Sequence, residues 1–309
     1  MTRRAALIFA ALGLAWGIPY LLIKVAGQEL APSVLVLGRT AVGALLLAPL
    51  ALGSRTSRGA LGAVARRWPA LAAYTVAEIV GPWFFLARAE QQLPSSTTAM
   101  LISAVPVVGV VVGLLGGRAH RLGGRGWLGL ALGSAGVAAL VGHDVLAGGL
   151  GSPGALAELA VVVVGYAVGP ALLARHLGDL PGLPVVASSL ALAALIYVPV
   201  VLLGPGLPAA LPSGRVLGSV AALAVVCTAS AFLLLFALVG ELGPVRATAI
   251  VYVNPVVAVL AGALFLGERV TGGTVVGFAL VLAGSFLVTR PAPAPVDAVE
   301  HEEPLTAPA

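Results

Sequence analysis

Pro106-Val-Val-Gly-Val-Val-Val-Gly113 recurs 149 residues later (255 − 106) as Pro255-Val-Val-Ala-Val-Leu-Ala-Gly262. A second pair, Gly129-Leu-Ala-Leu-Gly-Ser-Ala-Gly136 and Gly277-Phe-Ala-Leu-Val-Leu-Ala-Gly284, has nearly the same separation. None of the four stretches carries a charge, and all are apolar enough to lie in lipid. Repeated apolar segments predict a duplicated protein with several membrane spans, and such duplications are common among transporters.

The composition of the whole chain agrees with a membrane location. Of its 309 residues, 60% are hydrophobic and 9% are charged, whereas soluble domains carry about 25% charged residues. This chain has too few polar side chains to cover a surface that faces water. Its single cysteine, Cys227, excludes an internal disulfide. No clustered basic surface of the kind that binds nucleic acid is visible.

A helix needs about 20 apolar residues to cross the hydrocarbon core of a bilayer. By this measure the sequence predicts an all-α integral membrane protein with ten transmembrane helices, at residues 5–26, 33–53, 68–89, 95–115, 124–142, 154–174, 183–203, 216–239, 246–266 and 272–289. The first apolar run follows Thr2-Arg3-Arg4 as in a signal peptide. Because it is long enough to span and lacks a small-x-small cleavage site, we expect a retained helix.

Basic residues give an orientation through the positive-inside rule. With the N-terminus in the cytosol, four fall at the outer face, namely Lys24, Arg88, Arg215 and Arg269. Twelve fall at the cytosolic face, namely Arg3, Arg4, Arg55, Arg58, Arg66, Arg67, Arg118, Arg121, Arg125, Arg175, Arg246 and Arg290. This bias predicts an even number of spans in a bacterial-type plasma (inner) membrane, with both termini cytosolic.

The repeat divides the chain into two five-helix halves, at residues 5–142 and 154–289. Matched segments lie five spans apart, and because five is odd, the second half should cross the membrane upside down. Inverted repeats give inward-open and outward-open states that are near mirror images, which is a structural route to alternating access. Residues 291–309 are Pro-rich and acidic, so we expect a disordered cytosolic tail.

Several short motifs lie along the predicted spans. They are Ala15-Trp16-Gly17, Arg39, the Pro106 segment, Asn254-Pro255, and Leu266-Gly267-Glu268-Arg269 followed by Gly277-x6-Gly284. With them, residues 5–290 resemble the drug/metabolite transporter superfamily, and within it the EamA-like ten-helix transporters. The resemblance implies a central cavity lined mainly by helices one, three, four, six, eight and nine. It also implies small metabolites, amino acids or drugs as substrates.

The first half departs from this pattern at one motif. Gly117-Arg118-Ala119-His120 stands where the second half has Leu-Gly-Glu-Arg. Glu268 therefore has no symmetric partner, and a transport role for it does not follow from the resemblance.

Glu78 is the leading candidate for a functional side chain. It lies near the middle of the third span, where an ionised carboxylate costs several kcal/mol unless it is paired or hydrated. Its counterpart in the repeat is Cys227, so only one half carries the charge. Two readings stay open: a coupling or cation-recognising carboxylate, or a structural ion pair with Arg39 of the second span.

Helix breaks and aromatic residues suggest where a solute could bind. Gly17 and Pro19 interrupt the first helix beside Trp16 and Tyr20, which are four residues apart and share one face. The matching helix of the second half carries Gly165, Gly169 and Pro170. Paired breaks in matching helices point to a binding site, although packing kinks would give the same pattern.

Further candidates follow from the repeated proline segments. Pro106 and Pro255 each lack an amide donor, so both helices should bend near midplane. Asn254 and Tyr252 offer polar groups beside the second bend. Trp83, on the same span as Glu78, either joins the cavity wall or faces lipid.

No metal-binding or phosphate-binding motif occurs in the sequence, so no cofactor is expected. The only lysine, Lys24, does not follow a Gly-rich phosphate loop, which excludes a Walker-type ATPase. The sequence therefore predicts a secondary transporter that exports a small organic metabolite or drug-like solute, with protons as a candidate coupling ion. The alternatives are a membrane-embedded enzyme and a non-transporting sensor. A homodimer is left open.

Overall fold

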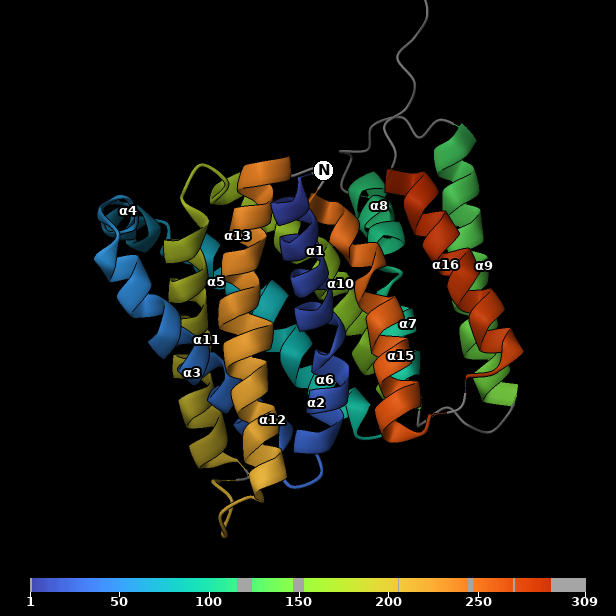
Figure 1. Cartoon of the computed structure of the whole chain (residues 1–309), viewed down its shortest axis with the longest axis horizontal. Coiled ribbons are helices and arrows are strands. Elements are labelled where there is room, and N and C mark those ends of the chain that lie inside the picture. The colour runs from blue at the N-terminus through green and yellow to red at the C-terminus, as the bar shows by residue number, and fades with distance from the viewer. Residues whose placement is uncertain are drawn as a thin grey trace, which may run out of the picture.

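A computed structural model of the chain describes residues 2–115, 124–146, 153–204, 206–243, 247–268 and 270–289. All regular structure within these ranges is helical (Figure 1). The predicted tail at residues 291–309, and the Gly117-Arg118-Ala119-His120 motif, lie outside them.

Each of the ten predicted spans contains helix. The first half consists of α1 (Arg3–Gly17), α2 (Pro19–Ala26), α3 (Pro32–Gly53), α4 (Arg55–Arg66), α5 (Trp68–Thr75), η1 (Val76–Val80), α6 (Gly81–Glu90), α7 (Ser95–Ile102), α8 (Val105–Leu115) and α9 (Gly124–Leu146). The second consists of α10 (Pro153–His176), α11 (Gly182–Leu203), α12 (Gly214–Ala224), η2 (Val225–Ser230), α13 (Ala231–Leu242), η3 (Thr248–Tyr252), α15 (Asn254–Leu266) and α16 (Gly272–Thr289).

Seven stretches in the described ranges are long and apolar enough to cross a membrane: Arg3–Ala26, Pro32–Gly53, Trp68–Glu90, Ser95–Leu114, Pro153–His176, Gly182–Leu203 and Gly214–Leu242. Ile250–Leu266 and Val275–Leu287 are shorter apolar helices. Large apolar side chains also face outward, including Leu45, Leu264 and Phe265, each more than 70% exposed. Such a surface suits lipid, and the protein is a multi-pass membrane protein.

The faces of the bundle can be named from Figure 1. The N-terminus, α4 and the end of α13 lie at one face, which we call the N-terminal face. The end of α2 and the start of α12 lie at the other, which we call the opposite face. Helix α1 starts at the N-terminal face, whereas its counterpart α10 ends there, since the His176 carbonyl accepts from Arg67 beside α4. Matched helices of the two halves therefore run in opposite directions.

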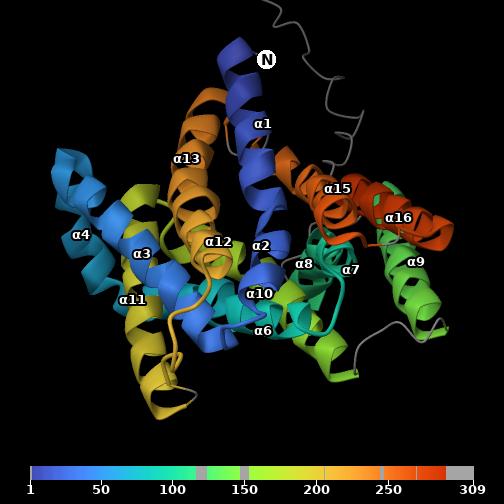
Figure 2. The same ribbon diagram turned by 60° about the horizontal axis from the view of Figure 1, so that its bottom comes forward.

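The two halves interlock along their length. Helix α3 packs against its counterpart α11, and α12 packs against both α2 and α3. Figure 2 shows α3 and α11 side by side at one end of the molecule and α9 with α16 at the other. The first half thus contacts the second at both ends of the bundle.

Glycines bring α9 and α16 into close contact. A Cβ atom on Gly136 would lie 2.7 Å from the Gly277 carbonyl oxygen, and one on Gly284 would lie 2.6 Å from the Gly129 carbonyl oxygen. The two repeated Gly-rich stretches therefore pack against each other. Gly109 and Gly113 on α8 do not make comparable contacts, since Gly113 has open space around its Cβ position.

Three of the four predicted proline breaks interrupt a span. Ile18 separates α1 from α2, which begins at Pro19. Residues 103–104 separate α7 from α8 just before Pro106. A short 3-10 helix, η3, precedes α15, where Pro255 occupies the first turn. A proline is tolerated at such helix starts because its missing N–H has no partner there.

The predicted break at Pro170 is wrong, because α10 continues from Pro153 to His176 with Pro170 inside it. Pro49 and Pro199 likewise lie inside the continuous helices α3 and α11. A proline within a membrane helix is tolerated where the surrounding helices and local adjustments satisfy the backbone groups that it frees. The breaks in the first and sixth spans are therefore not a symmetric pair.

Helix α4 was not predicted. Its residues were assigned to a connection because basic and small residues replace the apolar run there. Ser54 provides the N-cap, since its side chain accepts from the Ser57 backbone N–H. Helix α4, which carries Arg55, Arg58 and Arg66, lies at the N-terminal face. This agrees with the prediction from the positive-inside rule that these arginines lie at the same face as the N-terminus.

Candidate functional site

The third and eighth spans each contain a π-helical segment at the same place in the repeat. Segment η1 covers Val76–Val80 and η2 covers Val225–Ser230, so their starts are 149 residues apart (225 − 76). A π-helical turn widens a helix and changes the pattern of carbonyls that are bonded within it, and such turns are frequent at functional sites. In η1 the Val80 carbonyl accepts from the Tyr197 hydroxyl at 2.6 Å. In η2 the Thr228 hydroxyl donates to the Leu223 carbonyl at 2.8 Å.

Glu78 lies in η1 and packs against a glycine of α10. A Cβ on Gly169 would overlap with the Glu78 carboxylate, and one on Gly165 would lie 2.6 Å from the Pro82 ring. These glycines therefore let α10 approach η1 and α6 closely. The Oε2 atom of Glu78 is buried and has no hydrogen-bond partner among the described residues. A carboxyl group left unpartnered at this depth is expensive, which marks Glu78 as a functional candidate.

Two other buried carboxylates differ from Glu78 because each has a partner. Glu158 on α10 forms an ion pair with Arg88 at 2.9 Å. Glu90 at the end of α6 is fully buried and accepts from the Ser95 hydroxyl at 2.8 Å. Glu78 makes no comparable bond within the described part of the chain, so burial alone does not explain its presence.

Arg39 and Glu78 do not form an ion pair in this structure, which corrects the structural reading of the pair. The Arg39 Nε donates to the Thr228 hydroxyl of η2 at 2.8 Å. Its guanidinium carbon lies 3.6 Å from the centre of the Trp83 ring. Trp83 is 7% exposed, so it faces the bundle interior, and Arg39 joins α3 to the eighth span.

Tyr20 and Tyr166 complete a cluster of polar side chains around Arg39. Both hydroxyl groups lie within electrostatic range of the Arg39 guanidinium. Tyr166 on α10 is also within electrostatic range of Glu78. Tyr166 was missed from the sequence, although its position between Gly165 and Gly169-Pro170 was a usable signal.

The remaining candidates lie away from this cluster. Trp16 makes an edge-on contact with Phe232 on α13, with ring centres 6.2 Å apart. The Tyr252 hydroxyl donates to the Ser285 carbonyl of α16 at 3.0 Å. Asn254 lies at the contact between α1 and α15, where a Cβ on Gly17 would be 3.1 Å from its carbonyl oxygen. Its side-chain Oδ1 is buried without a partner in the described ranges, so it is a further unsatisfied polar atom near a helix break.

At the opposite face, hydrogen bonds join helices of different spans. Lys24 at the end of α2 donates to the carbonyls of Glu90 and Leu93, at 2.6 and 2.7 Å. The Ser213 backbone N–H, at the start of α12, donates to the Glu29 carboxylate at 2.7 Å. Bonds from the Ser213 hydroxyl and N–H hold the pKa of Glu29 below its ordinary value. The first span is thereby held to both the third and the eighth.

Glu268 makes a further connection at the opposite face. Its two carboxylate oxygens accept from the backbone N–H groups of Ser95 and Ser96, at 2.7 and 2.8 Å. These N–H groups begin α7, so a carboxylate from the end of the ninth span caps the fourth span and meets its positive dipole end. The Leu-Gly-Glu motif therefore has a clear structural role.

At the N-terminal face the ion pairs join neighbouring helices. Arg4 of α1 pairs with Glu241 of α13 at 2.9 Å, and the Thr2 hydroxyl also donates to Glu241. Helix α1 packs on α13, α15, η2 and η3.

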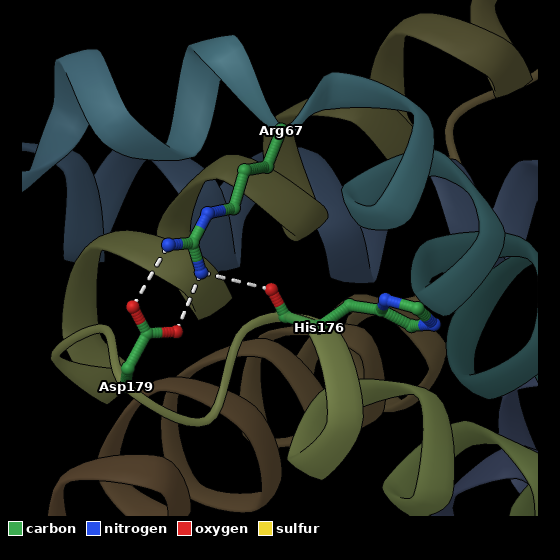
Figure 3. A network of polar contacts seen from close by, with 3 residues as sticks. All are labelled: Arg67, His176 and Asp179. Atoms are coloured by element: carbon green, nitrogen blue, oxygen red, sulfur yellow. Dashed lines mark hydrogen bonds and ion pairs between the residues drawn. The ribbon is translucent and has the colours of Figure 1, made fainter.

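Arg67 forms a second connection at this face (Figure 3). It donates to both carboxylate oxygens of Asp179 and to the His176 carbonyl, and so ties the start of α5 to the loop after α10. The hydrogen bonds with Arg67 hold the pKa of Asp179 below its ordinary value, and the same bonds raise the pKa of Arg67.

Comparison with known proteins assigns the fold to a family. A model of the EamA-like transporter family matches residues 3–142 and again residues 154–290. The chain belongs to the EamA-like transporter family. Each EamA repeat contains one of the π-helical segments, and the candidate cluster lies between them. The EamA-like transporters are membrane transporters, which is the functional class that the ten apolar spans predicted.

A solved structure supports the same fold. A chain described only as "Crystal structure of protein" aligns with a TM-score of 0.64 and 20% identity, and covers 94% of this chain and 97% of its own. No curated protein matches the sequence. No group of three or more His, Cys, Asp or Glu side chains that could hold a metal ion occurs in the searched ranges.

Proposed function

We propose that this EamA-like protein is a secondary active transporter that exports a small organic solute across the plasma (inner) membrane by alternating access. The observation that carries the proposal is Glu78, whose buried Oε2 atom has no hydrogen-bond partner among the described residues and which lies in a π-helical turn at mid-span. The positive-inside bias supports cytosolic termini, so the N-terminal face is the cytosolic one.

Glu78 couples the transport cycle to protons in this proposal. A carboxyl group sealed between helices favours its neutral form, and one that water reaches can ionise. Alternating access exposes Glu78 to each compartment in turn, so it would bind a proton from one side and release it to the other. Tyr166, which lies within electrostatic range of Glu78, is placed to sense this change of charge.

The distribution of contacts supports an alternating mechanism. At the opposite face, Lys24 and Glu268 join the first and ninth spans to the third and fourth. At the N-terminal face, the bonds of Arg4 and Arg67 join the first span to the eighth and the start of the third span to the loop after the sixth. In this proposal, bonds of this kind break and re-form at the two faces in turn, as inverted repeats allow.

The first test asks whether the protein moves a solute at all. Untargeted mass spectrometry of the medium from cells that overproduce the protein, and from cells that lack it, should reveal a solute enriched by overproduction. That solute, loaded into proteoliposomes with the purified protein, should leave them faster than it leaves protein-free liposomes. The absence of protein-dependent efflux for every enriched solute would contradict the proposed function.

A further inference from the structure

Arg39 is a buried cation without a counter-charge. Its residue is 6% exposed, and the ion pairs formed by described residues involve Arg4, Arg67 and Arg88 instead. A charge at this depth in a membrane costs several kcal/mol unless it meets an opposite charge or water. The Trp83 ring lies against one face of the guanidinium and offsets only part of that cost.

Most hydrogen-bond donors of Arg39 also have no partner among the described residues. A guanidinium carries five N–H donors in a fixed planar arrangement. The only hydrogen bond from Arg39 to a described residue runs from Nε to the Thr228 hydroxyl. The four donors on the two Nη nitrogens have no partner in the described part of the chain. Neither Nη is among the buried, unpartnered atoms that are sealed from solvent, so both keep some contact with solvent.

The neighbours of Arg39 fix its orientation. Thr228 holds Nε, and Trp83 holds the plane of the guanidinium. The Nη edge is thereby preorganised, and this edge matches the two oxygens of a carboxylate. Hydroxyl groups of Tyr20 and Tyr166 lie in electrostatic range and can supply further bonds to an anion.

We infer that Arg39 is an anion subsite that binds a carboxylate group of the transported solute. The inference deepens the proposed function, since it names the chemistry of the solute, and it rests on that function for its biological meaning. To join the helices, Arg39 would need only the hydrogen bond from Nε to Thr228 and the stacking of its guanidinium on Trp83. The Nη edge, which has no partner among the described residues, adds the capacity to bind a ligand.

Acetate is the smallest probe of such a subsite, and acetamide is its uncharged isostere. Thermal unfolding of the purified full-length protein should be measured with each probe at constant ionic strength set with sodium chloride. A bound ligand raises the unfolding midpoint, and a charge-assisted bidentate pair predicts about a tenfold or greater preference for acetate over acetamide. This binding measurement needs no transport, so its failure and a failure of the proposed function are separate results.

Three variants make the test decisive. Arg39→Met should bind acetate no better than acetamide. Arg39→Lys keeps a charge but lacks the planar pair of donors, so its preference should fall severalfold even if Arg39→Met does not fold. Arg88→Met removes an arginine that already has a carboxylate partner and should leave the preference unchanged. Equal stabilisation by acetate and acetamide in the unaltered protein, or a preference that survives in Arg39→Lys, would overturn the inference.

Discussion

The two halves of the molecule place the same π-helical turn at the same point of the repeat, but only the first half puts a charge there. Segment η1 carries Glu78, and η2 carries Cys227 at the matching position. Arg39 has the uncharged counterpart Ala187 (39 + 148), close to the same offset. Duplication thus supplied the shared helix geometry, and the ionisable groups were placed in one copy. Coupling to an ion needs such a difference in only one half.

The two halves also differ at the position of α10 that contacts Glu78. Gly169 of α10 lies against Glu78, and its counterpart at the repeat offset is Tyr20 (169 − 149). The first half therefore provides a bulky aromatic where the second provides no side chain. The close contact between a glycine and a mid-span carboxylate is therefore found in one half only.

The largest effect is expected from disrupting that contact. Gly169→Leu would force a side chain into the Glu78 carboxyl group, and overpacking of this kind costs about 1–3 kcal/mol. We expect loss of solute efflux together with a lower unfolding midpoint. Gly218→Leu on α12 is the matched control, because no atom lies within 4 Å of its Cβ position. Equal behaviour of the two variants would show that the contact with Glu78 has no special role.

A smaller effect is expected at the opposite face, where Glu268 caps α7. Glu268→Gln removes the charge and one acceptor oxygen from two N–H bonds, and the loss of a cap typically costs about 1 kcal/mol. This should shift the population toward a state open at the opposite face by about fivefold. The reaction rate of Ser96→Cys with a membrane-impermeant thiol reagent, in a Cys227→Ser background, measures that shift. Glu29→Gln, which alters a different bond at this face, should change the rate less.

The smallest effect is expected for the exposed pair of Arg67 and Asp179. Since the pKa of Asp179 is lowered by Arg67, the pair contributes stability above the ordinary pKa of about 4. That contribution is lost as the pH falls through the lowered pKa. Arg67→Ala should therefore lower the unfolding midpoint slightly, and by more at pH 7 than at pH 2, because the bond to the His176 carbonyl does not depend on the charge of Asp179. Because exposed pairs are screened, the difference at pH 7 should shrink further in 1 M salt.

Much of the fold could be predicted from the sequence, because a membrane-spanning helix has a long apolar run. Each predicted span contains helix, and seven stretches in the described ranges are long and apolar enough to cross a membrane. The Gly-rich repeats marked the surfaces where α9 and α16 pack. Helix α4 was missed, since an amphipathic helix of twelve residues lacks an apolar run. The predicted break at Pro170 was wrong because a proline within a membrane span need not end the helix, as Pro49 and Pro199 also show.

Less of the candidate site could be predicted, because the direction of each side chain depends on how the spans pack against one another. A mid-span charge identified Glu78 and Arg39 as unusual, but their separation was not predictable from depth alone. Tyr252 turned out to contact α16, and Trp16 to contact Phe232. Tyr166 entered the cluster because Gly165 and Gly169 bring α10 close to η1. These are consequences of pairwise helix contacts that no single segment specifies.

The comparison of Glu78 with Cys227 offers the most direct test of proton coupling. Proteoliposomes containing the Glu78→Gln or the Cys227→Ser variant should be assayed for uptake driven by a pH gradient and for exchange of the solute without a gradient. We predict that Glu78→Gln abolishes gradient-driven uptake but retains exchange, whereas Cys227→Ser retains both. Gradient-driven uptake at the unaltered rate in Glu78→Gln would contradict the account.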